Sequence, residues 1–306
     1  MADRSFPGSD HWTVVWARGK GCPELANLLG DGAASRVGAD LRSSCIDAGA
    51  DLLVARRLTS FNLIPVAAPH EFDPSAVRAV VAAVSGGPHS LLAAQVATRL
   101  GGALGVPTSL VTISPDPGSD DRAEAALRRA AAVAPAPEAR VVRAANPGTA
   151  ARALPAGSLL VLGIGGGTWW RRQLLGPGHR LRTGAPAGAV VVRTAPRRCF
   201  QEMGEPVAMG RQLPAAEALR LTTEAVLPVA ENGYLIGLVR RRVMEAAPPT
   251  VPLDTLMEPP RFVRLDDGLA AAADLAAFFE GAPVPVIDTD GRLCGLLPLS
   301  SPAPTR

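Results

Sequence analysis

Short, largely apolar runs alternate with longer segments of helical periodicity between residues 78 and 195. The apolar runs are AVVAAV at 79–84, TSLVTI at 108–113, ARVVRA at 139–144, SLLVLG at 158–163 and GAVVVR at 188–193. The segments with helical periodicity are 90–105, 119–133 and 146–154. A short apolar run bounded by turn residues is typical of a buried parallel strand. The alternation therefore predicts an α/β domain with an open parallel sheet flanked by helices.

The first 70 residues follow a less regular pattern. The predicted strands are 11–17, 50–57 and 61–69, and the predicted helices are 23–29 and 35–49. Whether such a short apolar run forms a strand or a helix is predicted from its length and its flanking residues. They suggest a βα extension over residues 1–70, either as part of the first domain at 71–195 or as an addition to it.

Beyond Ala195 the chain contains an internal repeat. Residues 196–202 form a linker, the repeats cover 203–245 and 255–299, and 300–306 form a tail. The predicted helices are 214–221 and 268–279, and the predicted strand pairs lie within 226–239 and 284–297. An Asn-Gly or Asp-Gly turn separates the two strands of each pair, as is typical of hairpins. A repeat of this size seldom buries its apolar face alone, so we predict that the two pack together as an α+β pair.

Composition and charge narrow the class of protein. The 306-residue chain is 47% apolar with a formal net charge of +3, which is typical of a globular protein and too weak to favour a nucleic-acid partner. The four cysteines lie far apart without nearby histidine pairs, so we expect reduced thiols and no metal site. The N-terminus lacks a secretory pattern, and no apolar run approaches the roughly 20 residues of a membrane helix. We therefore expect a cytoplasmic protein without a membrane partner.

Glycine-rich segments follow two of the predicted strands. Ser85, Gly86 and Gly87 follow the strand at 79–84, and GIGGGTWWRRQLLGPG at 163–178 follows the strand at 158–163. Ligands of open parallel sheets bind beyond the carboxyl ends of the strands, and glycine lets the backbone approach a phosphate closely. The two segments predict a ligand crevice at one edge of the sheet, with a turn that holds no ligand as the alternative.

The spacing of Gly163, Gly166 and Gly176 resembles the nucleotide-binding loop of the universal stress protein family, in its ATP-binding branch. The resemblance covers Arg78 to Ala195 and includes strand order, loop position and the closing A-P-x-x-A-V-V-V segment. It implies an adenine nucleotide, ATP or AMP, and we predict no metal. The candidate binding residues are Ser85, Gly86, Gly87, Gly163, Gly166, Gly176, Pro177, Gly178 and His179. Pro177 stands where the family has Ser or Thr, and Ser85 stands where it has a nucleoside-binding Asp.

The repeat resembles a tandem pair of CBS domains, the Bateman module, from Met203 to about Leu299. The residues that carry the resemblance are L-P-V at 227–229 with Gly233 and Gly237, and V-P-V at 284–286 with Gly291 and Gly295. Such pairs often bind adenosine nucleotides between their repeats. Where the family has Ser or Thr after the last glycine, the first repeat has Arg240 after Gly237 and the second repeat has Pro298 after Gly295. Because guanidinium matches phosphate well, Arg240 is a further candidate binding residue, with a solvated helix face as the alternative.

These resemblances imply a non-enzymatic, regulatory protein of the stress-response type that senses an adenine nucleotide through one or both domains. A ligand can act in this way only through different affinities for two states. We expect a homodimer, since both families commonly pair, and the sequence does not identify a protein partner. No catalytic residue is predicted, because the histidines lack the neighbours of a triad. The alternatives are a nucleotide hydrolase or transferase that uses the loop at 163–178, and an interaction scaffold without a ligand.

Overall fold

The protein is described by a computed structural model, which divides into two compact units, residues 1–195 and 196–306. Each unit is described by itself. The residues that the structure describes are 11–17, 19, 21–32, 34–38, 40–57, 61–114, 117–136, 138–144, 154–164 and 185–299. The helix predicted at 146–154 falls almost wholly outside these residues.

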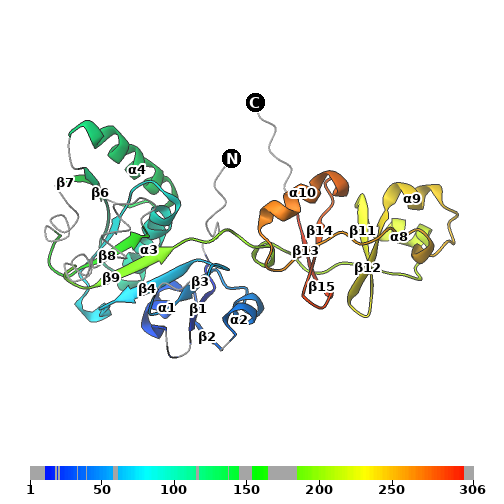
Figure 1. Ribbon diagram of the computed structural model, residues 1–306, viewed down its shortest axis with the longest axis horizontal. Coiled ribbons are helices and arrows are strands. Elements are labelled where there is room, and N and C mark those ends of the chain that lie inside the picture. The colour runs from blue at the N-terminus through cyan, green and yellow to red at the C-terminus, as the bar shows by residue number, and fades with distance from the viewer. Residues whose placement is uncertain are drawn as a thin grey trace. The chain divides into compact units, whose positions relative to one another are not determined.

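The first unit is built on a nine-stranded sheet in the order β2-β1-β3-β4-β9-β8-β5-β6-β7 (Figure 1). The strands are β1 (Val14–Ala17), β2 (Ser35–Val37), β3 (Leu52–Val54), β4 (Val66–His70), β5 (Ala79–Ala83), β6 (Thr108–Ser114), β7 (Glu138–Arg143), β8 (Ser158–Gly163) and β9 (Ala189–Arg193). All five strands predicted between residues 78 and 195 are present. The prediction of an α/β domain with a large, mainly parallel sheet is confirmed.

One strand pair of this sheet differs from the prediction of a parallel sheet. β4 and β9 pair antiparallel, with His70 opposite Ala189 and Val66 opposite Arg193, whereas the other neighbouring strands pair parallel. The first 70 residues therefore do extend the sheet, but their four strands run in the opposite direction to the other five. Nothing in the apolar runs themselves specifies strand direction.

The two halves of the sheet share one connectivity. In the first half, β1 has β2 on one side and β3 followed by β4 on the other. In the second half, β5 has β6 on one side and β8 followed by β9 on the other, so that β2-β1-β3-β4 matches β6-β5-β8-β9. The second half adds β7 at its edge. The last strands of the two halves, β4 and β9, meet at the antiparallel pair. The strand order of the first half is thus repeated in the second half, and nothing in the apolar runs of the sequence indicates this repetition.

Among the described residues, the helices of the first unit follow their predicted positions except near residue 35. They are α1 (Pro23–Leu29), α2 (Leu41–Asp47), α3 (Pro88–Leu104) and α4 (Asp120–Val133). Residues 35–37, predicted as part of a helix, form β2 beside β1. The helix begins instead at Leu41, because the Asp40 side chain accepts hydrogen bonds from the backbone N–H groups of Arg42 and Ser43, which is the preferred arrangement at a helix start.

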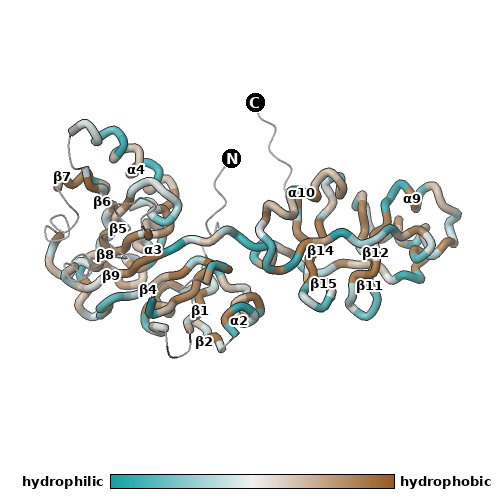
Figure 2. Tube along the Cα trace, in the orientation of Figure 1, coloured by the Kyte–Doolittle hydropathy of each residue, from teal (hydrophilic) through white to brown (hydrophobic). Residues whose placement is uncertain are grey.

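The long helix α3 lies at the centre of the packing of the first unit. Pro88 occupies its first turn, and Gly105 ends it in the left-handed conformation with φ +66°, as helix starts and ends prefer. Nine of its residues are buried, and it contacts β5, β8 and β9. Figure 2 shows the apolar character of β8 and β9 in brown. Burial of this apolar surface is the main stabilising contribution.

The second unit contains two three-stranded sheets of the same design, one per repeat. The first repeat has β10 (Met209–Gly210), α8 (Ala215–Leu221), β11 (Val226–Glu231), β12 (Tyr234–Arg240) and α9 (Arg241–Ala246). The second has β13 (Val263–Arg264), α10 (Leu269–Phe279), β14 (Val284–Ile287) and β15 (Leu293–Leu297). In each sheet a parallel pair is followed by an antiparallel hairpin that carries an irregularity at the same place. The predicted internal repeat is therefore present.

The two repeats exchange their first residues. Gly204, at the start of the first repeat, pairs with Leu296 of the second, and Glu258, near the start of the second, pairs with Leu238 of the first. Gly295 permits the first crossing, because a Cβ there would lie 2.5 Å from the carbonyl oxygen of Gly204. The repeats therefore fold as one pair, as their size predicts.

Candidate functional site

The candidate residues of the first unit lie at one edge of the sheet as far as the structure describes them. Ser85, Gly86 and Gly87 follow β5, and Gly163 ends β8, the neighbouring parallel strand. Their strands therefore place them on the same rim, as the sequence predicts. The other candidates, Gly166, Gly176, Pro177, Gly178 and His179, lie outside the described residues.

Packing explains two of these glycines. A Cβ on Gly163 would overlap the carbonyl group of His89 and lie 2.7 Å from the backbone nitrogen of Ser90, in the first turn of α3. Gly86 has φ +80°, and its Cβ would lie 3.3 Å from Ala126 of α4. Both glycines allow close contact between a strand end and a helix. Gly87, by contrast, has no atom within 4 Å of the Cβ position.

His89 ties the start of α3 to the end of the first unit. Its Nδ1 accepts a hydrogen bond from the backbone N–H of Thr194 at 3.1 Å and lies 2.8 Å from the Thr194 hydroxyl. Burial lowers the pKa of His89, and the nearby Arg193 charge lowers it further. The ring is therefore held neutral with Nδ1 as the acceptor.

Acid should weaken the first unit through this histidine. Because the folded pKa of His89 lies below its usual value of 6.5, the unfolded chain takes up the proton first, and stability is lost as the pH falls below about 6.5. The replacement His89→Asn supplies a neutral acceptor and is expected to reduce this loss. Urea unfolding at pH 7.5 and 5.5, followed by tryptophan fluorescence, measures it. An equal loss in wild type and variant would contradict the assignment.

Arg240 belongs to the second unit, where its guanidinium is engaged within the protein. Its Nη1 donates to the Glu280 carboxylate at 2.8 Å and to the Phe278 carbonyl oxygen at 3.2 Å. Its Nε lies 2.9 Å from a carboxylate oxygen of Glu258, and its side chain is only 14% exposed. It lies at the end of β12 and not on a solvated helix face. A phosphate would have to displace these carboxylates.

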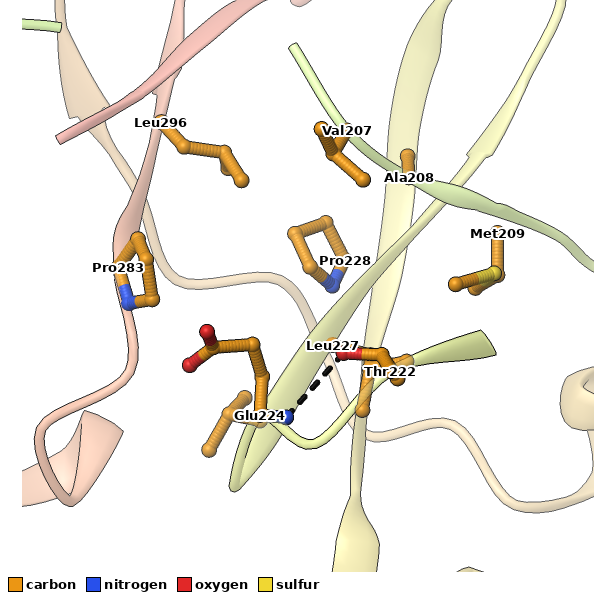
Figure 3. A pocket seen from close by; sticks show the side chains of 10 residues that line it. Val207, Ala208, Met209, Thr222, Glu224, Leu227, Pro228, Pro283 and Leu296 are labelled. Carbon is orange, nitrogen blue, oxygen red and sulfur yellow. Dashed lines mark hydrogen bonds between the residues drawn. The ribbon is translucent and has the colours of Figure 1, made fainter. Parts of the chain in front are cut away.

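A hollow lies between the two repeats, at a place that the sequence analysis did not select (Figure 3). The space within it that a water-sized molecule can occupy is about 30 Å³. Its lining residues are Val207, Ala208, Met209, Thr222, Glu224, Val226, Leu227, Pro228, Pro283 and Leu296. The first repeat supplies most of this wall, and the second contributes Pro283 and Leu296. That volume is far below the roughly 300 Å³ at which ordinary ligand sites begin, so the walls of the hollow would have to separate for a ligand to enter.

The wall of the hollow is apolar with one carboxylate. The lining contains two residues with polar side chains, Thr222 and Glu224, and the backbone N–H of Glu224 donates to the Thr222 hydroxyl at 3.1 Å (Figure 3). The lining contains no Lys or Arg. Val207 is 57% exposed, so an apolar side chain lies open at its rim. The wall therefore offers apolar contacts and one carboxylate that can accept hydrogen bonds from N–H donors.

One sequence difference could have indicated this hollow. Arg240 follows Gly237 by three residues, and Pro298 follows Gly295 by three residues. A long side chain is thus present at the end of one hairpin and absent from the other. In the sequence this difference is a departure from a family pattern, and it does not by itself show that the two side chains fill different amounts of space beside their hairpins.

In the part of the chain that the structure describes, the His, Cys, Asp and Glu side chains are dispersed. No group of three or more His, Cys, Asp and Glu side chains there could hold a metal ion. The four cysteines are free thiols, and burial raises the pKa of Cys45 and Cys199 to about 12. No helix among the described residues has the length and apolar character needed to cross a membrane.

Comparison with known proteins yields structural neighbours for about a third of the chain. No family model matches the sequence, and no curated protein matches it. Solved structures that match include the cytosolic domain of the Mg²⁺ channel MgtE in complex with ATP, at 27% identity and TM-score 0.30, over 33% of this chain and 45% of that one. A CBS domain pair/ACT domain protein from Thermotoga maritima matches at 19% identity and TM-score 0.31, over 34% and 90%.

A third neighbour is CBSX2 in complex with AMP, at 23% identity and TM-score 0.29, over 33% of this chain and 89% of that one. The chain spans less than half of the MgtE structure that it matches. CBS domain pairs are thus among the structural neighbours of this chain.

Proposed function

We propose that this chain is a regulatory protein that senses an adenine nucleotide in the hollow of its second unit, which we take to be a tandem CBS pair. The hollow between the repeats is the observation that supports the proposal. Its apolar wall suits a purine ring, and the Glu224 carboxylate can accept a hydrogen bond from an exocyclic amino group. Because the hollow has room for about 30 Å³, we propose that the repeats separate to admit the base, while the ribose and the phosphates extend towards solvent.

The coupling of the two repeats supports a regulatory role. Leu296 of the second repeat pairs with Gly204 of the first and also lines the hollow, so a ligand there would contact both repeats. Such a ligand can favour one arrangement of the pair over another through its different affinity for each. We take the first unit to be a universal-stress-type domain, a proposal supported by the strand order of its second half.

Filling the hollow should abolish binding. We expect AMP, ADP or ATP to bind the wild-type chain in calorimetric titrations, and Ala208→Trp to weaken the affinity by about tenfold or more, since the indole occupies the ligand's space. The control Val243→Trp adds the same ring at an exposed position of α9, where Val243 is 38% exposed, and should bind as the wild type does. Equal affinities in both variants would place the ligand elsewhere.

The same titrations test the alternative functions. Turnover of ATP in the presence of Mg²⁺ would favour a hydrolase or transferase, and the absence of binding to any of the three nucleotides would favour a scaffold. We also propose that the chain is a cytoplasmic homodimer. Light scattering on the purified chain measures the oligomeric state, and a monomer would contradict that part of the proposal.

A further inference from the structure

The two repeats match position by position around the hollow. Gly237 and Gly295 each make room for a methionine from the start of the other repeat, since a Cβ would lie 2.7 Å from the sulfur of Met257 and 2.8 Å from that of Met203. Leu238 and Leu296, which follow these glycines, each pair across the repeats. Leu238 is therefore the counterpart of Leu296, a residue that lines the hollow.

Two further parts of the wall have counterparts in the second repeat. Val207 lies two residues ahead of β10, and Arg261 lies two residues ahead of β13. The loop that holds Thr222 and Glu224 joins α8 to β11, and the loop that holds Glu280 joins α10 to β14. A second hollow would therefore be expected beside Leu238, Arg261 and Glu280.

That place is occupied by the side chain of Arg240. Its guanidinium carbon lies 4.2 Å from the centre of the Phe278 ring, and that of Arg261 lies 4.3 Å from the same centre. Glu280 and Glu258 supply the opposite charges. A planar cation that stacks on an aromatic ring and pairs with carboxylates is held firmly. The counterpart of Arg240 in the first repeat is Pro298, an exposed residue too short to reach across a comparable space.

We propose that the second repeat contains a latent copy of the ligand site, which Arg240 closes from within. This inference rests on the proposed function, which makes the hollow a ligand site, whereas the closure by Arg240 rests on its own contacts. One chain then binds one ligand, although its fold offers two equivalent places. The occupant of the closed site also indicates what the space accepts, which is a planar group with several N–H donors that faces a carboxylate.

Removing the guanidinium should open the latent site. In Arg240→Ala, millimolar ethylguanidinium chloride is expected to raise the unfolding temperature of the second unit by about 4 °C or more relative to equal sodium chloride, because it refills the vacated space. Scanning calorimetry of the full chain measures this shift. All four tryptophans belong to the first unit, so fluorescence identifies the other transition. The wild type should show no such rise.

Arg211→Ala is the matched control, because Arg211 forms an ion pair with Glu231 at 3.2 Å in the same unit with a half-exposed side chain. It should not respond to ethylguanidinium. If Arg240→Ala does not fold, Arg240→Met retains the apolar stem and still removes the guanidinium. An unfolding temperature that ethylguanidinium raises no more in the Arg240 variant than in the Arg211 variant overturns the proposal.

The number of AMP molecules bound provides the second measurement. Titration calorimetry should give one AMP per wild-type chain and two per Arg240→Ala chain, whereas Pro298→Arg should lose the wild-type binding. A wild type that binds AMP and an Arg240→Ala chain that still binds one overturn the latent site. If the wild type binds no AMP, the proposed function fails instead, and the ethylguanidinium experiment alone decides on the closure.

Discussion

Replacing Gly188 by alanine is expected to destabilise the first unit by about 3–5 kcal/mol, a combination of backbone strain and steric overlap. Gly188 has φ +83°, and a Cβ there would overlap the carbonyl oxygen of Glu71. This residue precedes β9 at the antiparallel junction with β4, and its carbonyl accepts a hydrogen bond from Leu160. A shift of the backbone would therefore disturb the junction of the two half-sheets. Urea unfolding followed by tryptophan fluorescence measures the loss.

Gly105→Ala separates strain from overlap in this measurement. Gly105 also has a positive φ, +66°, but nothing lies within 4 Å of its Cβ position. We expect a loss of about 1 kcal/mol from strain alone. If the two variants are equally stable, the close approach of Glu71 to Gly188 does not exist in solution.

Phe279→Ala is expected to destabilise the second unit by about 3–5 kcal/mol, because it leaves a cavity in a closely packed core. Phe279 ends α10 and is fully buried. It shares one core cluster with residues of both repeats, among them Val226 and Leu238 of the first. The loss should therefore affect the whole pair and not the second repeat alone. Hydrogen exchange of peptides from both repeats measures how far it spreads.

Phe262→Ala is the control for this variant. Phe262 is 37% exposed, so its removal leaves no closed cavity, and we expect a loss below about 1 kcal/mol. The first unit should unfold as in the wild type in both variants. Faster exchange confined to peptides of the second repeat in Phe279→Ala would show that the repeats are stable independently, contrary to their shared core.

The parts of the fold that depend on local pattern could be predicted from the sequence. β5, β8 and α3 have apolar runs or apolar faces bounded by glycine or proline, and α1 was predicted with its observed ends. The direction of β4 relative to β9 depends instead on contacts between residues more than 100 positions apart, such as His70 and Ala189. The brief strand β2 was missed because a long helical pattern around it concealed the start signal at Asp40.

The candidate site was predictable only in part, because a glycine can allow either a ligand or a packed helix to approach the backbone closely. The position of Gly163 at the rim follows from strand order, but its contact with His89 requires the packing of α3 to be known. Arg240 was selected for its charge, and its carboxylate partners lie 18 and 40 residues away in the chain. The hollow consists mainly of apolar residues such as Val207 and Pro228, which resemble core residues until their exposure is known.

The reversal of direction at β4 and β9 divides the first unit into two poles. Since β1 and β3 run against β5 and β8, the loops that follow the two sets of strands emerge at opposite ends of one sheet. A strand of five residues extends about 16 Å, so a molecule as small as a nucleotide base at one pole cannot touch the other. Substitutions in the loop after β1 and in the loop after β8 should therefore have additive effects on stability.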